Sequence, residues 1–289
     1  MGLTIHYSLR VKGKSPLKGL ERVRQRAMDL PFEEVGPIQH IIGEHACNFE
    51  HATGANRWML IQAGAYVDEP VQGDKGSHYS FQVNPVEVMG FNIDVAPGSE
   101  PLNVLCCKYP AEIQVRGRMT RKGFSTTLKT KLRGWTGGSF CKTQYASNLG
   151  IPNFLRAHIS VITILEYMQT LTGWEVDIRD EGDYGQNWSC PDWREADAEG
   201  RERVYASYPG HHDIPRLVAE VGEWNAMIAS FAGAMKDNLP NGQSLLAPIL
   251  AYKDFEHLEA LGLKDMPPES LNLFLKACAA VPLPADEDE

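Results

Sequence analysis

The stretch LTIHYSLRV at residues 3–11 decides the fold class, because apolar and polar residues alternate along its whole length. Successive side chains of a strand point to opposite faces of a sheet, so this pattern predicts a half-buried strand. Ser15 and Pro16 follow, and these residue types are typical of the start of a helix. Apolar residues then recur at helical spacing up to Met28. The chain therefore begins with a strand and a helix.

Between residues 57 and 145 the sequence has the character of β-structure. Short runs of apolar and β-branched residues are separated by Gly, Pro and other turn-forming residues, as is typical of successive strands. The segment APGSEP at 96–101 is a turn signal and predicts a hairpin between its two flanking strands. The expected strands are 58–61, 86–95, 102–107, 112–116, 125–132 and 139–145.

Helices are expected again after this β-rich middle. Pro152 begins the clearest helix, whose apolar stripe continues to Met168 and is followed by Gly173. A strand is expected at 174–178, and Asp213 stands where it would cap a further helix.

Strands in the middle with helices before and after predict an α+β fold, with a mixed, mainly antiparallel sheet flanked by helices. Residues 1–240 are expected to form a single domain. Residues 241–289 are expected to form a linker, a short helix and an acidic disordered tail, which together make a small C-terminal helical appendage.

The chain has 289 residues, of which 43% are hydrophobic and 22% charged, and its formal net charge is −9. These values exclude a largely disordered chain, a collagen-like fibre and a disulfide-stapled miniprotein. The N-terminus lacks the apolar core of a secretory signal, and no apolar run reaches the about 18 residues of a membrane span. Six cysteines without a CxxC pair are typical of reduced thiols. A cytoplasmic protein with no membrane contact is expected.

Acidic residues are absent between Glu112 and Glu166, a window of 53 residues that holds nine Lys and Arg. A block of one charge sign favours anionic partners. Lys129, Lys131 and Arg133 are two residues apart, so on a strand they would share one face and hold phosphates. The alternative is that the cations pair with acidic residues elsewhere or form a solvated face. The expected phosphate-binding residues are Arg116, Arg118, Lys129, Lys131 and Lys142.

The leading hypothesis is a protein that handles a phosphate-bearing ligand, either a nucleotide or a nucleic acid. Asp180, Glu181 and Asp183 follow one another where a strand is expected to end, and carboxylates are the ligands that Mg²⁺ prefers. If the chain is an enzyme, these three residues predict a metal-assisted hydrolase. The competing interpretation is an acidic turn, which Asp and Gly favour in any case.

A hydrolase or transferase with Cys141 as its nucleophile is the third-ranked hypothesis. His158 lies on the apolar stripe of the next helix and therefore faces the sheet. An imidazolium beside a thiol lowers the pKa of the thiol, and Asp180 is a candidate to orient the imidazole ring. The alternative is a buried free cysteine and a core histidine.

The second-ranked hypothesis is a non-catalytic subunit of a larger assembly, whose basic face meets an acidic protein partner. Tyr184, Trp188 and Trp193 lie in a long polar excursion and would form the contact surface. The oligomeric state is left open.

Two further motifs are interpreted as structural. The glycine-rich segment 134–143 lacks the glycine that a Walker A motif places before Lys-Thr, so a turn between strands is expected. His40, His45, Cys47 and His51 crowd into twelve residues, but their spacing matches no common zinc site, and no zinc is expected there.

Overall fold

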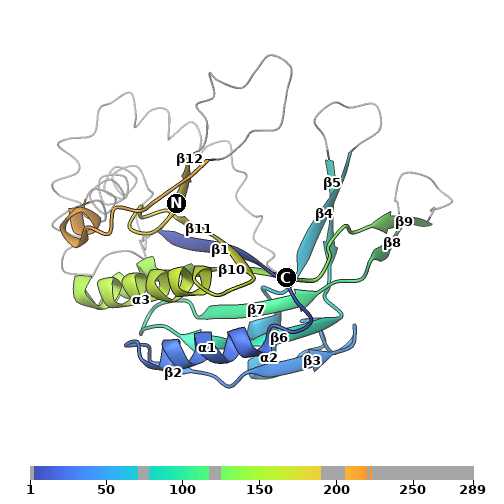
Figure 1. Ribbon diagram of the computed structural model, residues 1–289, viewed down its shortest axis with the longest axis horizontal. Coiled ribbons are helices and arrows are strands. Elements are labelled where there is room, and N and C mark those ends of the chain that lie inside the picture. Colours follow the sequence, from blue (N-terminus) through green and yellow to red (C-terminus); the bar gives the residue numbers. More distant parts are fainter. Residues whose placement is uncertain (1–2, 71–77, 117–124, 190–205, 220–221, 223–289) are drawn as a thin grey trace, which may run out of the picture.

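The computed structural model describes residues 3–70, 78–116, 125–189, 206–219 and 222 (Figure 1). The described part has an α+β fold built on one seven-stranded sheet and three two-stranded sheets. In chain order the elements are β1 (Thr4–Val11), α1 (Leu17–Met28), β2 (Glu34–Val35), β3 (Gln39–Ile42), α2 (Ala55–Leu60), β4 (Ala65–Pro70), β5 (His78–Val83), β6 (Glu87–Asp94), β7 (Leu102–Lys108), β8 (Glu112–Arg116), β9 (Ser125–Lys129), β10 (Trp135–Lys142), the 3-10 helix η1 (Thr143–Leu149), α3 (Ile151–Gln169), β11 (Trp174–Asp180), β12 (Asn187–Ser189) and β13 (Ala206–Tyr208). Residues 214–219 and 222 are also helical.

The large sheet has the strand order β11-β1-β10-β7-β6-β2, and β3 also pairs with β6. Each of these pairs is antiparallel. Strand β1 lies between β10 and β11, which the chain connects through η1 and α3. In this register His6 stands opposite Phe140 of β10 and Arg179 of β11, whereas Ile5 points to the other face.

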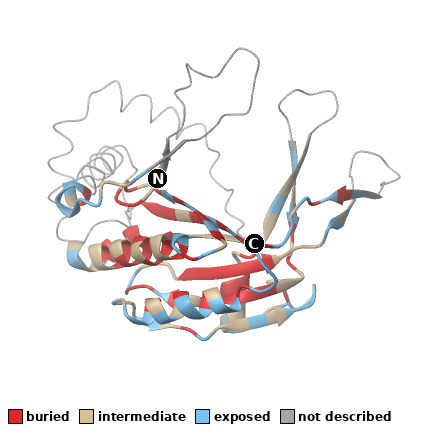
Figure 2. Ribbon diagram, viewed as in Figure 1, coloured by how far each residue is buried: buried red, intermediate tan, exposed pale blue. Residues whose placement is uncertain are grey.

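Helices α1 and α3 cover one face of the sheet and enclose the main core (Figure 1). Figure 2 shows the buried residues concentrated in the sheet and on the sides of these helices that face it. Leu20 and Val23 of α1 and Phe154 and Ile162 of α3 are fully buried, as is Ile5 beneath them. Burial of each such side chain stabilises the fold by about 1.5–3 kcal/mol.

On the opposite face, the described residues that cover the sheet lie over β6 and β7. Met59 and Leu60 of α2 pack there with Val88, Leu105 and Cys107 in a second, smaller apolar cluster. Over β11, β1 and β10 the outward side chains are instead exposed or half-buried, except that of Thr4 at the start of β1, which is buried, and we call this surface the open face. The open face consists of His6, Ser8, Arg10, Thr136, Gly138, Phe140, Lys142, Glu175, Asp177 and Arg179.

The ladder between β10 and β7 consists of a single residue pair, Thr136 and Cys107. Beyond this pair, Tyr7 reaches across from β1 and connects to the backbone of β7. Its hydroxyl donates to the Asn103 carbonyl oxygen and accepts a hydrogen bond from the Leu105 N–H at 3.4 Å. Burial raises the pKa of Tyr7, so the phenol keeps its proton and remains a donor.

Gln62, which follows α2, and Gly137 of β10 complete this junction. Gln62 Nε2 donates to the Phe140 carbonyl oxygen at 3.4 Å, and Gln62 Oε1 accepts a hydrogen bond from Asn103 Nδ2 at 2.8 Å. A Cβ at position 137 would overlap the carbonyl oxygen of Leu105. Glycine is therefore required where β10 and β7 approach one another.

Two hairpins, β4–β5 and β8–β9, extend away from the large sheet and from the helical layer (Figure 1). Strand β8 follows β7 and β9 precedes β10, so hairpin β8–β9 begins and ends beside the junction of these two strands. Most of the described residues in both hairpins are exposed or half-buried (Figure 2).

Several expected elements are confirmed. The strand at 3–11, the helix after Pro16 and the hairpin around 96–101 are all present, and the helix expected from Pro152 begins one residue earlier, at Ile151. Asp213 caps the helix at 214–219, because its Oδ1 accepts a hydrogen bond from the Arg216 N–H at 3.2 Å. None of the helices in the described ranges is long and apolar enough to cross a membrane. Residues 241–289 lie outside the described residues.

Four expectations were wrong in detail. Residues 58–60 form the end of helix α2, and Ile61 follows as its C-cap, instead of the expected strand, because a short apolar run does not distinguish the two. The glycine-rich segment 134–143 is mostly strand β10 instead of a turn, because Gly137 permits the close approach of β7. Strand β9 ends at Lys129, so the strand expected to continue to residue 132 is shorter. Strand β10 ends at Lys142 and η1 begins at Thr143, so the strand expected to continue to residue 145 is shorter as well.

We expect Gly137→Ala to destabilise the protein by on the order of 3 kcal/mol, because the added methyl group has no room beside the β7 backbone. Gly222→Ala is the matched control, since residue 222 is exposed and helical and a Cβ there meets nothing within 4 Å. The control should stabilise the protein by about 0.5–1 kcal/mol. Urea unfolding of both variants measures the difference, and equal stabilities would contradict this account of the junction.

Candidate functional site

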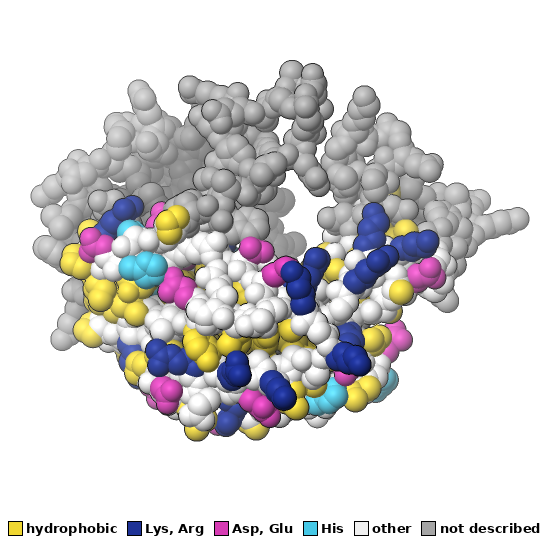
Figure 3. Space-filling model, in the orientation of Figure 1, with side chains coloured by type: hydrophobic (Ala, Val, Ile, Leu, Met, Phe, Trp, Pro, Cys, Tyr) yellow, Lys and Arg dark blue, Asp and Glu magenta, His cyan; other side chains and the backbone are white. Residues whose placement is uncertain are grey.

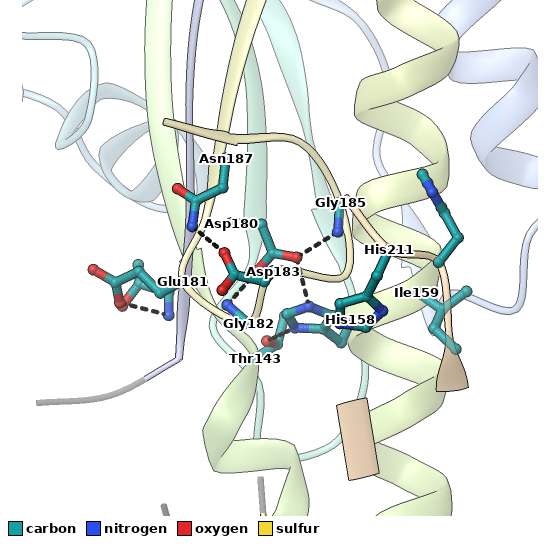
Figure 4. Close-up of polar contacts among 12 residues, drawn as sticks. Thr143, His158, Ile159, Asp180, Glu181, Gly182, Asp183, Gly185, Asn187 and His211 are labelled. Carbon is teal, nitrogen blue, oxygen red and sulfur yellow. Dashed lines mark hydrogen bonds and ion pairs between the residues drawn. The ribbon is translucent and has the colours of Figure 1, made fainter. Parts of the chain in front are cut away.

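His158 of α3 lies between Thr143 of η1 and Asp180 of β11 (Figure 4). His158 Nε2 donates to Asp180 Oδ2 at 3.1 Å, and Thr143 Oγ1 lies 2.8 Å from His158 Nδ1. The backbone N–H groups of Gly182 and Gly185 also donate to the Asp180 carboxylate, at 2.9 and 2.8 Å. The sequence hypothesis that Asp180 orients His158 is consistent with this geometry.

The Asp180 carboxylate is held in its charged form by these contacts. Burial acts in the opposite direction and would by itself raise the pKa of Asp180. Attraction to His158, together with the hydrogen bonds from His158, Gly185 and Gly182, outweighs burial and lowers the pKa below its usual value.

Thr143, His158 and Asp180 are all fully enclosed, with 0% of each residue exposed. The hydrogen bonds occupy both ring nitrogens of His158 and both oxygens of Asp180. A ligand therefore has no free group to contact at this centre. Its evident effect is to join α3, η1 and the end of β11 to one another.

Cys141 belongs to the same buried side of the sheet but has other partners. Its Sγ donates to the Glu100 carbonyl oxygen at 3.2 Å and lies 3.8 Å from Ser99 Oγ. Thr143, and not Cys141, contacts His158 Nδ1. Burial raises the pKa of Cys141 to about 12, whereas a thiolate nucleophile requires a lowered pKa. Both the position and the pKa of Cys141 differ from those that the nucleophile hypothesis requires.

The carboxylates of the expected metal site diverge (Figure 4). Asp180 points into the core, Glu181 Oε2 accepts a hydrogen bond from the Thr4 N–H at 3.0 Å, and Asp183 Oδ1 accepts one from Asn187 Nδ2 at 2.5 Å. These three side chains do not form a common ligand set for Mg²⁺. More generally, the described residues contain no group of three or more His, Cys, Asp or Glu placed to hold a metal ion.

The cations of the acid-free window lie on different parts of the fold. Figure 3 shows Lys and Arg side chains gathered on the right of the view, at hairpin β8–β9. Lys129 and Lys131 are exposed there, but the strand ends at Lys129 and Lys131 has a φ of 59°, so the expected shared strand face with Arg133 does not form. Lys142 lies on the open face, and Arg156 Nη2 pairs with Glu33 on the helical side at 2.6 Å.

Some sequence hypotheses concern residues outside the described part of the chain. Arg118 and Trp193 lie outside the described residues, and the side chains of Arg116 and Trp188 are likewise not described. Tyr184 is buried, and its ring packs edge-on against His158 with 6.2 Å between the ring centroids. Tyr184 thus belongs to the buried centre and not to an exposed contact surface.

The open face carries a row of three flat side chains that sequence reasoning did not single out. Phe140, His6 and Arg179 stand opposite one another on β10, β1 and β11. The rings of His6 and Phe140 have centroids 6.0 Å apart, and Lys142 Nζ lies 5.5 Å from the Phe140 centroid. Gly138, the next outward-facing residue of β10, has no side chain, so none projects beside Phe140 at this position.

Charges on the open face are only partly paired. Glu175 lies 2.5 Å from the Nζ of Lys12. In the described part of the chain, no carboxylate pairs with Arg10 or Arg179. Burial lowers the pKa of His6, and repulsion from Arg179 acts in the same direction against the attraction of Glu181. A lowered pKa keeps the imidazole of His6 neutral near pH 7.

The alternation at 3–11 and 174–180 was the signal that could have revealed this row. The polar positions of this alternation predict that His6 and Arg179 face outward on two strands. That the two strands are neighbours, and that Phe140 completes the row, depends on a register between segments more than 100 residues apart, which the local pattern does not contain.

We expect Asp180→Asn to destabilise the protein by about 3 kcal/mol, because the amide cannot accept every hydrogen bond that the carboxylate accepts. The pKa of Asp180 is lowered by folding, so its contribution to stability is present above the unfolded value and is lost as pH falls through the folded value. Asp177→Asn, an exposed carboxylate on the same strand, should change stability by less than about 0.5 kcal/mol. Urea unfolding between pH 7 and pH 3 measures both effects, and a variant with wild-type acid sensitivity would refute the assignment.

Iodoacetamide at neutral pH should leave Cys141 unmodified in the folded protein, because its thiol is enclosed and its pKa is about 12. The same residue should react after unfolding in urea, which serves as the control. Peptide mass spectrometry follows the modification, and preferential labelling of Cys141 in the folded state would restore the nucleophile hypothesis.

Comparison with known proteins does not assign the chain to a family. No protein-family model, no curated protein and no solved structure matches it. The function proposed below therefore depends on the geometry of the described side chains.

Proposed function

We propose that the chain binds a phosphate-bearing ligand with a flat ring, a nucleotide or a nucleic acid, on its open face. The observation that carries this proposal is the row formed by Phe140, His6 and Arg179. Aromatic rings, imidazoles and guanidinium planes are the groups on which proteins stack nucleobases. The row points away from α1 and α3, so the packing of the main core does not account for it.

Cations around the row are suited to contact phosphates. Lys142 and Arg10 lie toward opposite ends of the open face, and Arg179 is in the row itself. Lys142 Nζ lies 3.6 Å from Glu100, and both side chains are about one-third exposed, so this ion pair is weak. A phosphate can therefore compete for Lys142 at little cost.

The net charge of −9 does not conflict with such a site, because affinity for phosphates depends on the contacts made locally. Two of the nearby carboxylates already have partners. Glu175 pairs with Lys12, and Glu181 accepts a hydrogen bond from the Thr4 N–H. Asp177 is exposed on the same face and favours ligands whose phosphates lie toward Lys142 or Arg10.

The proposal is one of binding and includes no catalytic step. Asp180 alternates with Arg179 along β11 and points to the opposite side of the sheet. The carboxylate expected at the centre of a metal-assisted hydrolase is thus separated from the open face by the sheet itself.

We expect Phe140→Leu to weaken nucleotide binding about tenfold, because leucine keeps apolar bulk but removes the flat ring, and stacking contributes about 1–3 kcal/mol per base. Arg179→Gln should weaken binding and reduce its salt dependence. Arg22→Gln removes an exposed arginine from α1 and is the matched control, which should bind like the wild type. Isothermal titration calorimetry with individual nucleotides and short oligonucleotides measures these effects. The absence of binding by the wild type at low salt would refute the proposal.

A further inference from the structure

Resting on this proposed function, we propose that the natural ligand is a single-stranded nucleic acid that crosses the row of Phe140, His6 and Arg179 and then follows β10 toward Lys129 and Lys131 at hairpin β8–β9. Its unpaired bases stack on the row of Phe140, His6 and Arg179. Its phosphates contact the cations at the two ends of this path.

The row favours unpaired bases. Neighbouring strands are about 4.8 Å apart, so three side chains in a row across β10, β1 and β11 span about 10 Å of a nearly flat surface. A base in a duplex has both of its faces stacked on neighbouring bases and cannot lie on such a surface. Single-stranded bases expose these faces, and two or three of them fit the row.

Strand β10 connects the row to the hairpin. Its outward-facing residues are Lys142, Phe140, Gly138 and Thr136, which follow one another along the open face. Arg133 precedes Thr136 by three residues, so its backbone lies within about 10 Å of the end of the face. The polypeptide thus leads directly from the row to the cationic end of hairpin β8–β9.

Hydrogen bonds fix the backbone at the cationic end of the hairpin. Thr130 lies between the two lysines, its N–H donates to the Ala111 carbonyl oxygen at 2.9 Å, and its hydroxyl donates to the Pro110 carbonyl oxygen at 2.6 Å. Lys129 and Lys131 are exposed on either side of this anchor. They therefore project from a fixed stretch of backbone and need less ordering when they contact phosphates.

No acidic side chain in the described part of the chain forms an ion pair with Lys129 or Lys131, although Glu112 stands opposite Lys129 in the β8–β9 ladder. The window between Glu112 and Glu166 supplies no acidic residue to this part of the path. Charge therefore favours an anionic strand from Lys142 to Lys129.

Fluorescence anisotropy with labelled oligothymidylates of 3, 6 and 12 nucleotides, and with a 12-base-pair duplex, tests the path. We expect the 12-mer to bind at least tenfold more tightly than the 3-mer, and the duplex to bind at least tenfold more weakly than the 12-mer at the same salt. Oligouridylates of the same lengths show whether the site prefers RNA. Equal affinity for the duplex would overturn the inference.

Two sets of variants separate this inference from the proposed function. The double variant Lys129→Gln and Lys131→Gln should weaken the 12-mer at least fivefold and lower its salt slope by roughly 0.7 per lost contact, with the 3-mer unchanged. Phe140→Leu should weaken both. Lys18→Gln with Arg22→Gln removes two exposed cations from α1 and should change neither.

The possible failures are distinguishable. If the 3-mer and the 12-mer bind equally and the hairpin variant matches the wild type, the path is wrong although the open face still binds its ligand. If Phe140→Leu also has no effect on either oligonucleotide, the proposed function fails as well. Circular dichroism of each variant confirms that a loss of binding is not a loss of folding.

Discussion

The register of β1 between β10 and β11 is the constraint on which the rest of the structure depends. It places Ile5, Tyr7 and Leu9 in the core and His6, Ser8 and Arg10 on the outside. A shift of one residue would exchange the two faces and would bury charged groups beneath α1 and α3. The core and the open face are therefore two consequences of one alignment, and neither can change without the other.

The buried centre and the open face lie back to back on β11. Asp180 is held from the inside by His158 and by two glycine N–H groups, whereas Arg179, the preceding residue, points outward. Fixing Asp180 also fixes the end of the strand that presents Arg179. The buried centre thus fixes the end of the strand that carries part of the surface on which we place the ligand.

Local patterns predicted most of the elements but few of their contacts. Alternation and helical spacing located β1, α1, α3 and β11, because burial on one side imposes these periods directly. The apolar run at 58–61 was misassigned, since both a helix and a strand bury such a run. Asp180 was rightly placed next to His158, yet Thr143 was missed as the second partner, because the strand was expected to pass through it and not to end at Lys142. The row of Phe140, His6 and Arg179 requires the order of three strands, which no local pattern contains.

The most direct test of the central claim is a nuclear magnetic resonance titration of ¹⁵N-labelled protein with a single-stranded 12-mer at low salt. The account predicts that the amide signals of His6, Phe140 and Arg179 shift as the oligonucleotide is added, together with those of Lys129 and Lys131. The signals of exposed residues on α1, such as Lys18 and Arg22, should remain in place. Shifts confined to the helical side, or no shifts at all, would contradict the claim that the open face binds nucleic acid.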